Sequence, residues 1–115
     1  MKEVKAYVRP SRMEAIYNAL RAAGFRCMTL TYGEGTGRFT VARKEMNKPP
    51  RQPFMHIEVV KIEIICTLDE VEKIVRIIHK NGITEFSGNG IIMVTDLEKV
   101  YNIKSENSGE KVLKP

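Results

Sequence analysis

The stretch that decides the fold is residues 28–38, which read MTLTYGEGTGR. Its first five residues favour a strand, and from Gly33 to Gly37 every second residue is glycine. The basic segment that follows, residues 39–55, contains three prolines and has no period typical of a helix or a strand. A compact domain rarely keeps about fifteen such residues in mid-chain unless they form a lid, a binding loop or a linker. We therefore expect a rigid base that presents this loop.

Before this stretch, the sequence predicts a strand followed by a helix. Residues 4–8 alternate between apolar and polar side chains, which is typical of a half-buried strand. Ser11 and Glu14 have the spacing of a capping box, and Gly24 is a typical helix end. The apolar residues between them recur at helical spacing and are Met13, Ile16, Tyr17, Leu20 and Ala23.

After the loop, residues 56–66 predict a long strand. Its apolar positions change from odd to even numbers between Val59 and Val60. A bulge at this point would explain the change, and so would a strand that leaves the sheet there.

The rest of the chain predicts a second helix and a last strand. Thr67 is expected to cap the helix, which would end near Gly82. Its apolar stripe would be Val71, Ile74, Val75 and Ile78. Residues 91–94 are wholly apolar and predict a short central strand, and residues 100–103 are a candidate for a short edge strand.

The expected order is strand, helix, strand, long loop, strand, helix, strand. Two βαβ halves joined by a long hairpin make an α+β, ferredoxin-like sandwich with both helices on one face of the sheet. The other face then needs cover, and in a chain this short we expect another subunit to supply it. The domain would span residues 1–104, with the loop at about 39–55, and residues 105–115 would be a polar, mobile tail.

Length and composition agree with one cytoplasmic domain. The chain has 115 residues and a formal net charge of +5, which favours an anionic partner but does not choose among nucleotide, nucleic acid, membrane surface and acidic protein. We expect neither a membrane span nor a signal segment, because no apolar run is long enough and the N-terminus is not apolar. Cys27 and Cys66 stand alone in the sequence, so we expect buried thiols.

Two glycine-containing motifs could bind an anion. In Gly33-x-Gly35-x-Gly37-Arg38, the glycines allow a phosphate to approach the backbone and the arginine can pair with it. The alternative is a strand that merely bends into a loop. In Thr84-x-x-x-Gly88-Asn89-Gly90, two glycines around one residue can form a nest of N–H groups, or simply a tight turn.

The basic loop is expected to dock a protein partner. Nucleic-acid binding usually combines basic residues with interleaved aromatic ones, whereas here the two phenylalanines lie only at the loop's ends. The candidate partner-binding residues are Phe39, Arg43, Lys44, Lys48, Arg51 and Phe54. His56 and His79 form no ligand pattern with the cysteines, and no motif marks an activated nucleophile, so we expect neither a metal site nor an enzyme.

Taken together, these residues resemble the PII-type nitrogen regulatory proteins. The likeness runs without gaps over residues 1–38 and resumes at residues 60–64 and 84–90. The segments that carry it are Arg9-Pro10-x-Arg12-Met13, Ala19-Leu20, Met28-Thr29-x-Thr31, Gly35-x-Gly37-Arg38, Val60-Lys61-Ile62-Glu63-Ile64 and Thr84-x-x-x-Gly88-Asn89-Gly90.

The resemblance implies a homotrimer of ferredoxin-like subunits that carries no prosthetic group and binds ATP, ADP or AMP as an effector in the clefts between subunits. The long loop, called the T-loop in this family, would dock on a membrane transporter or a metabolic enzyme. By position, the adenine and ribose side would comprise Thr29, Gly35, Gly37, Arg38, Glu63 and Ile65. The phosphates would be held by Ser87, Gly88, Asn89, Gly90 and Lys104.

The chain departs from the family on the phosphate side. Asn89 replaces the usual Asp, Ile91 replaces a Lys, and Asn102 and Lys104 stand where two Arg are usual. Charge-assisted contacts to phosphate contribute about 1.5–3 kcal/mol each. We therefore expect weaker polyphosphate binding, or a preference for ADP or AMP.

The loop departs from the family as well. Phe39 replaces the Gln that helps to bind Mg and 2-oxoglutarate, and Val59 replaces the lysine at the loop's base. The change at Phe39 is the main argument against sensing of 2-oxoglutarate with Mg, while Lys61 lies near the position of the missing lysine. The loop also lacks the tyrosine that is uridylylated in many members.

Two alternatives remain open at this point. One is a PII-fold sensor of another signal, such as a metal, bicarbonate or another small anion, coupled to a transporter. The other is a nucleic-acid-binding module, which the net charge of +5 and the basic loop would motivate.

Overall fold

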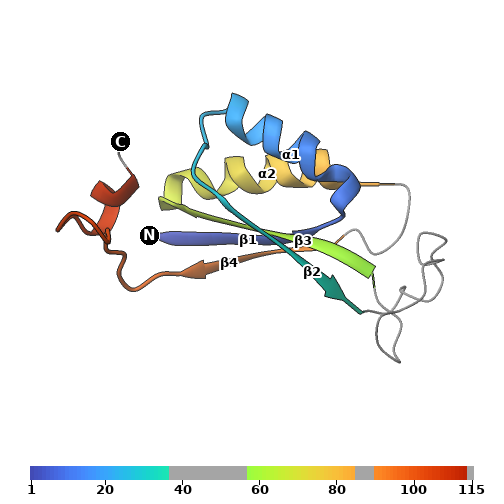
Figure 1. Cartoon of the computed structure of the whole chain (residues 1–115). Helices are drawn as coiled ribbons and strands as arrows, with labels where there is room; N and C mark the ends of the chain where they lie inside the picture. The colour runs from blue at the N-terminus through green and yellow to red at the C-terminus, as the bar shows by residue number, and fades with distance from the viewer. Residues whose placement is uncertain (37–56, 85–89, 114–115) are drawn as a thin grey trace.

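The computed structural model describes residues 1–36, 57–84 and 90–113. Figure 1 shows a four-stranded sheet with two helices packed against one of its faces. The strand order is β2-β3-β1-β4, and all neighbouring strands are antiparallel. The elements are β1 (Lys2–Val8), α1 (Pro10–Ala22), β2 (Thr29–Gly35), β3 (Ile57–Cys66), α2 (Val71–Gly82) and β4 (Ile91–Asp96). The predicted ferredoxin-like α+β fold is thus confirmed.

The two helices begin differently. Helix α1 begins at Pro10 after an extended Arg9, so the predicted cap at Ser11 is wrong. Proline suits the first helical position because its fixed φ is already helical and its missing N–H has no partner there anyway. Thr67 lies where predicted, and its backbone N–H donates to the Glu70 carboxylate at 2.9 Å. A short 3-10 turn, η3 (Leu68–Glu70), then leads into α2.

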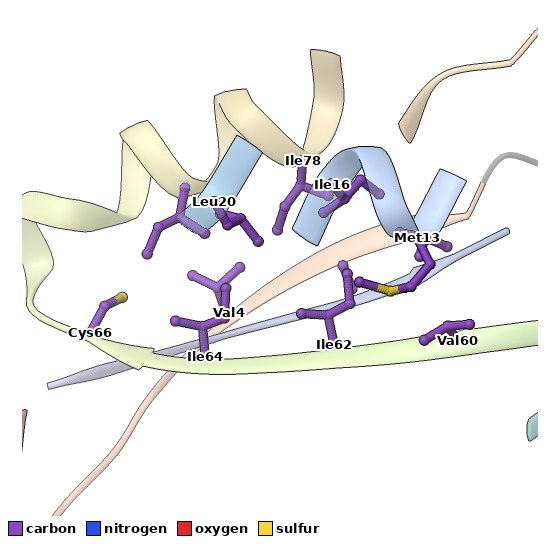
Figure 2. Close-up of a cluster of buried hydrophobic side chains, with 12 residues drawn as sticks. Val4, Met13, Ile16, Leu20, Val60, Ile62, Ile64, Cys66 and Ile78 are labelled. Carbon is purple, nitrogen blue, oxygen red and sulfur yellow. The ribbon is translucent and has the colours of Figure 1, made fainter. Parts of the chain in front are cut away.

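The core lies between the helices and the sheet. Figure 2 shows strand side chains such as Val4 and Ile62 pointing toward Ile16, Leu20 and Ile78 of the helices. The alternation along β1 and the helical spacing along α1 are what place these residues on facing surfaces. The buried apolar residues are Val4, Ala6, Val8, Met13, Ile16, Leu20, Val60, Ile62, Ile64, Cys66, Ile74 and Ile78.

Strand β3 extends beyond the end of β1. Their last pair is Val8 with Val60, while β3 continues to pair with β2 as far as Ile57. The register is continuous through Val59, so there is no bulge. The apolar positions change from odd to even numbers because Ile57 and Val59 lie on the sheet face without helices. They belong to a two-stranded ribbon, formed by the ends of β2 and β3, that projects past the rest of the sheet. The ribbon's end leads to residues 37–56, which include the predicted loop of residues 39–55 and lie outside the described residues.

Three further expectations are wrong. Strand β4 lies at an edge of the sheet because it pairs with β1 alone among the described strands. Residues 100–103 form no strand; Tyr101 makes only an isolated bridge to Ser108, and the tail continues into the 3-10 turn η4 (Gly109–Leu113). Cys27 is exposed rather than buried, whereas Cys66 is buried as expected, and both are free thiols.

The division into a domain of residues 1–104 and a mobile tail stays a prediction. None of the described helices has the length and apolar character needed to cross a membrane.

Candidate functional site

The sheet face without helices carries a cluster of charges at its centre. Lys5 Nζ lies 3.9 Å from Glu63 Oε2, and Lys61 Nζ lies 3.7 Å from Glu63 Oε1. Lys5 Nζ is also 4.0 Å from Glu3 Oε1. The four side chains are between 21% and 32% exposed and their charges cancel. The face therefore has a neutral polar centre although the whole chain is basic.

Apolar side chains surround this cluster. Ile91 is 59% exposed and Ile65 is 37% exposed. By register, Tyr7 lies between Lys61 and Ile91 on the same face. The helix-free face therefore combines a charge-balanced centre with exposed apolar side chains at Ile65 and Ile91.

The structure brings together three residues of the predicted adenine and ribose side. Thr29 of β2 lies directly opposite Glu63 of β3. Ile65 follows two positions later in β3, so all three lie on the helix-free face. Thr29 is exposed and Glu63 already contacts two lysines. Their roles as ligands stay predictions.

Gly35 lies at the tip of the described ribbon, opposite Ile57. Gly33 and Gly35 both belong to a regular strand rather than a bend, and neither has a positive φ. A Cβ added to them would meet only Val59 side-chain atoms, at 4.0 and 3.6 Å. The fold therefore does not require glycine at either position, and the missing side chains leave room for another group. Gly37 and Arg38 lie outside the described residues.

Gly90 has a different reason to be glycine. Its φ is 112°, and a Cβ there would lie 1.8 Å from the carbonyl oxygen of Tyr7. No other amino acid fits this position without moving the backbone of β1. Gly90 is nevertheless exposed on its other side. The remaining predicted phosphate residues of this motif, Ser87, Gly88 and Asn89, lie outside the described residues.

Lys104, the last predicted phosphate ligand, lies far from Gly90 within one chain. Strand β4 separates them, and its six residues span about 20 Å. Gly90 directly precedes the start of β4, whereas the tail that follows β4, orange-red in Figure 1, lies beside the N-terminus at the other end of the sheet. Asn102 accepts hydrogen bonds from the backbone N–H groups of Lys104 and Ser105, both at 3.0 Å, so its side-chain oxygen is engaged within the tail.

The structure also contains two hollows that the sequence did not reveal. A cleft of about 180 Å³ lies between the last turn of α2 and the adjoining ends of β1 and β4, with His79, Gly82 and Gly90 in its wall. A more open groove of about 340 Å³ lies between α1 and β2, where Tyr32 is exposed. Neither hollow is marked by a sequence motif, because each is lined by residues that are distant in the sequence.

The predicted partner-binding residues of the loop, 39–54, lie outside the described residues.

Comparisons with known proteins agree on one family. The family model described as nitrogen regulatory protein P-II matches residues 1–107. Nitrogen regulatory protein P-II 2 of Methanothermobacter thermautotrophicus is 33% identical, over 98% of this chain and 97% of its own length. Nitrogen regulatory protein P-II of Porphyra purpurea is 32% identical, over 98% of this chain and 100% of its own. Nitrogen regulatory protein GlnK of Escherichia coli is 26% identical, over 98% and 100%.

Proposed function

The chain belongs to the nitrogen regulatory protein P-II family and is a PII-like signal-transduction regulator; we propose that it works as a cytoplasmic homotrimer that binds an adenine nucleotide between its subunits. The bound nucleotide would set the state of residues 39–55, which would control a membrane transporter or a metabolic enzyme. The proteins that it resembles are named as regulators, which supports a binding role rather than catalysis.

The observation that carries the proposal is the separation of the candidate residues. Gly35 and Gly90 lie toward the end of the sheet where β1 ends, whereas Ile65 and Lys104 lie toward or beyond the opposite end. One chain cannot fold these groups around one ligand. Two copies packed side by side could, with the glycine end of one subunit against Thr29, Glu63 and Ile65 of the next.

The helix-free face supports self-association. Its central charges are already paired within one chain, so a second copy can cover them without leaving a charge unpaired. The exposed isoleucines at positions 65 and 91 would gain from burial, at roughly 25 cal/mol per Å². A neutral contact face also avoids the repulsion expected between two copies that each carry +5.

The chemistry of each half fits a nucleotide with few phosphates. The Glu63 carboxylate can accept hydrogen bonds from ribose hydroxyls, and Ile65 offers an apolar contact for a base. On the phosphate side, the exposed Ile91 that follows Gly90 carries no charge that could pair with a phosphate. The Asn102 side-chain oxygen already accepts a hydrogen bond from the Lys104 backbone N–H. We therefore propose that ADP or AMP binds at least as well as ATP.

Regulation requires that the nucleotide favour one state of the loop. A ligand shifts a conformational equilibrium only by the difference between its affinities for the two states. Strand β2, which leads into the loop, begins at the candidate ligand Thr29 and ends at the candidate ligand Gly35. A nucleotide in the shared cleft would thus contact β2 of both subunits, at Gly35 beside the loop of one and at Thr29 of the other.

Calorimetry with ATP, ADP and AMP tests the proposal. We expect all three to bind, with ADP or AMP not weaker than ATP, and sedimentation to give a trimer. Absence of binding by every nucleotide at millimolar concentration would refute the nucleotide site, and a monomer at assay concentration would refute the shared cleft.

Mixed oligomers test whether two chains share each site. Glu63→Ala should disable the half of the cleft that Thr29, Glu63 and Ile65 form, and Gly35→Val should disable the glycine half that the neighbouring subunit supplies, so each variant alone should bind weakly. When the two variants are coexpressed, some clefts receive an intact half from each chain, and binding should return. If each site belongs to a single chain, mixing will restore nothing.

A second candidate is a sensor of a small anion such as bicarbonate. It is favoured by the absence of a side-chain charge at Gly90-Ile91, where a polyphosphate would need cations. Titration with bicarbonate, in the presence and absence of ADP, separates the two: a saturable response to bicarbonate alone would support the second candidate.

A further inference from the structure

The chain carries a small arm beyond one end of its sheet and an apolar cleft at the other end. The arm comprises residues 100–109, whose ends are joined by a hydrogen bond from the Gly109 N–H to the Val100 carbonyl at 2.9 Å. The cleft is the one of about 180 Å³ between α2, β1 and β4. We propose that Ile103 on the arm of one subunit inserts into this cleft of the next subunit. The inference deepens the proposed homotrimer and rests on it, but it needs no nucleotide.

Hydrogen bonds hold the arm in one shape. The Asn102 N–H donates to the Asn107 carbonyl at 2.9 Å. The Asn102 side-chain oxygen accepts from the backbone N–H groups of Lys104 and Ser105, both at 3.0 Å. Ile103 lies within this turn, and its side chain is fully exposed. The arm therefore presents a large apolar side chain to solvent on an ordered backbone.

An isoleucine displayed in this way is suited to anchor a partner. Burial of an apolar side chain is favourable, and little conformational entropy is lost when the backbone that carries it is already ordered. Interfaces owe most of their affinity to a few anchors that fill pockets. The question is then which pocket Ile103 fills.

The arm cannot reach the cleft of its own chain. Gly90 of the cleft wall precedes β4 and the arm follows it, and the six residues of β4 span about 20 Å. The segment between β4 and the arm is fixed to the start of β1, because the Leu97 N–H donates to the Met1 carbonyl at 3.1 Å. Figure 1 shows the orange-red tail beside the N-terminus. Ile103 is therefore available to another molecule.

The cleft matches an isoleucine in size and in chemistry. A cavity of about 150 Å³ with apolar walls holds benzene, and the side chain of isoleucine has fewer carbon atoms than benzene. Ile83 and Ile91 in the wall are themselves exposed, so insertion would bury apolar surface of both partners. The apolar side chains that line the cleft are those of Val8, Ile78, Ile83, Ile91 and Ile92.

The charges favour a second copy as the occupant. Two chains that each carry +5 repel each other, so surfaces through which copies meet should add no like charge. On the arm, Lys104 and Glu106 cancel, and the described residues that line the cleft include no acid, lysine or arginine. An acidic partner attracted by the positive charge of the chain would find no cluster of basic residues on either of these two described surfaces.

The contact would be head to tail, because each chain carries both an arm and a cleft. Such a contact closes into a ring or continues as a filament, and a ring of three is the proposed trimer. Insertion of Ile103 would also bring Lys104 of one chain toward Gly90 of the next, since Gly90 belongs to the cleft wall. The arm would thus bring together two candidate ligands that lie beyond opposite ends of β4 in one chain.

Cysteine cross-linking of the nucleotide-free protein tests the contact directly. The variant carries Ile103→Cys and Ile83→Cys, with Cys27→Ser to remove the exposed native thiol. A short bis-maleimide should join position 103 of one chain to position 83 of the next and give covalent trimers. A second variant with Ile91→Cys in place of Ile83→Cys samples the other exposed residue of the wall. Absence of cross-links in both variants would overturn the inference.

Leu68 offers a matched control. It is also a large apolar residue, 67% exposed, but it lies in η3 and not on the arm. Leu68→Cys in place of Ile103→Cys should give no covalent trimer. Equal cross-linking from position 68 would show that the contact is not specific to the arm and would overturn the inference.

Sedimentation at a series of concentrations measures what Ile103 contributes. Ile103→Ser should raise the subunit dissociation constant at least about tenfold, because an apolar anchor is lost, whereas Leu68→Ser should leave it unchanged. Both side chains are exposed, so neither change should alter the helix content measured by circular dichroism. An unchanged dissociation constant in Ile103→Ser would overturn the inference.

The outcomes separate this inference from the nucleotide proposal. A trimer that shows neither the cross-link nor the effect of Ile103→Ser overturns the inference and leaves the nucleotide site to calorimetry. Cross-linked trimers of a protein that binds no nucleotide support the inference, while the nucleotide proposal fails. A wild type that stays monomeric at assay concentration overturns both the head-to-tail contact and the shared cleft.

Discussion

The two glycine-containing segments of this protein differ in what the glycines do. Gly33 and Gly35 belong to a projecting edge ribbon, have ordinary backbone angles, and have room for a Cβ beside Val59. Gly90 has a φ of 112° and no room at all, because the Tyr7 carbonyl occupies the place of a Cβ. Glycine in the ribbon is thus available for a ligand, whereas glycine before β4 is required by the fold.

This difference teaches that glycine spacing alone does not separate a binding loop from a packing constraint. Both segments suggested anion binding in the sequence, and both also had a purely structural explanation. Gly33 and Gly35 lie in a regular strand that ends at Gly35, and the rest of this motif, Gly37 and Arg38, lies outside the described residues, so both explanations stay open there. Close packing accounts for Gly90 without any ligand. Mutations can test each side of this comparison.

The largest effect is expected for Gly90→Ala. The methyl group would overlap the Tyr7 carbonyl, and the backbone angle is unfavourable for alanine, so we expect a loss of about 3–5 kcal/mol in the free energy of unfolding. Gly24→Ala is the control, because Gly24 has a φ of 97° but no atom within 4 Å of an added Cβ. It should cost only about 1–2 kcal/mol. Urea denaturation measures both, and equal losses would contradict the packing argument.

A smaller effect is expected where Gly82 meets Ile16. Ile16→Val should cost about 1 kcal/mol on its own and should remove the Cδ1 atom that lies 3.3 Å from an added Cβ at Gly82. Gly82→Ala should then be more favourable in the Ile16→Val background than in the wild type, by about 0.5–1 kcal/mol. A double-mutant cycle in urea measures this coupling. Additive effects would mean that the helices separate freely at this point.

The ribbon glycines should matter least for stability. Gly33→Ala and Gly35→Ala should each change the free energy of unfolding by no more than about 0.5 kcal/mol, because the new methyl groups meet only ordinary contacts. ADP binding, measured by calorimetry, should nevertheless weaken in Gly35→Ala if a ligand approaches there. A large loss of stability in either variant would show that the ribbon is as constrained as Gly90.

The ion pair between Lys2 and Asp96, at the C-terminal end of β4, should make stability depend on pH. A hydrogen bond and the charge of Lys2 lower the pKa of Asp96, which is fully exposed. Because the folded-state pKa is lowered, this pair stabilises the fold above the unfolded-state pKa, and the contribution disappears as pH falls through the folded-state value. Carboxyl chemical shifts should show a low midpoint for Asp96 that rises in Lys2→Met. An unchanged midpoint would show that the pair is not formed in solution.

Local patterns were sufficient for most of the fold. The helical spacing of Met13, Ile16 and Leu20 placed them correctly in the core, since a helix face depends only on nearby residues. The predicted start of α1 was wrong because two local signals compete there. The capping box pointed to Ser11, whereas Pro10 is the first residue of the helix. The edge position of β4 and the exposure of Cys27 depend on distant neighbours, which local patterns do not contain.

The candidate site was only partly accessible to sequence reasoning. The resemblance indicated which residues to consider, but not that Thr29 and Glu63 lie directly opposite each other, nor that Gly90 and Lys104 lie beyond opposite ends of β4. The two helices are also joined by a hydrogen bond that Arg12 Nε donates to the Asn81 carbonyl at 2.7 Å, which the sequence did not indicate because the two residues are 69 positions apart.

The sequence by itself determined the family, the order of helices and strands, and the buried face of each helix, because these follow from motifs and from periods of a few residues. The tertiary structure decided which glycine is required by packing, which strand lies at the edge, and how the candidate ligands divide between the two ends of the sheet. Those properties depend on strand register and on contacts between distant residues. Neither can be predicted from the pattern of a few neighbouring residues.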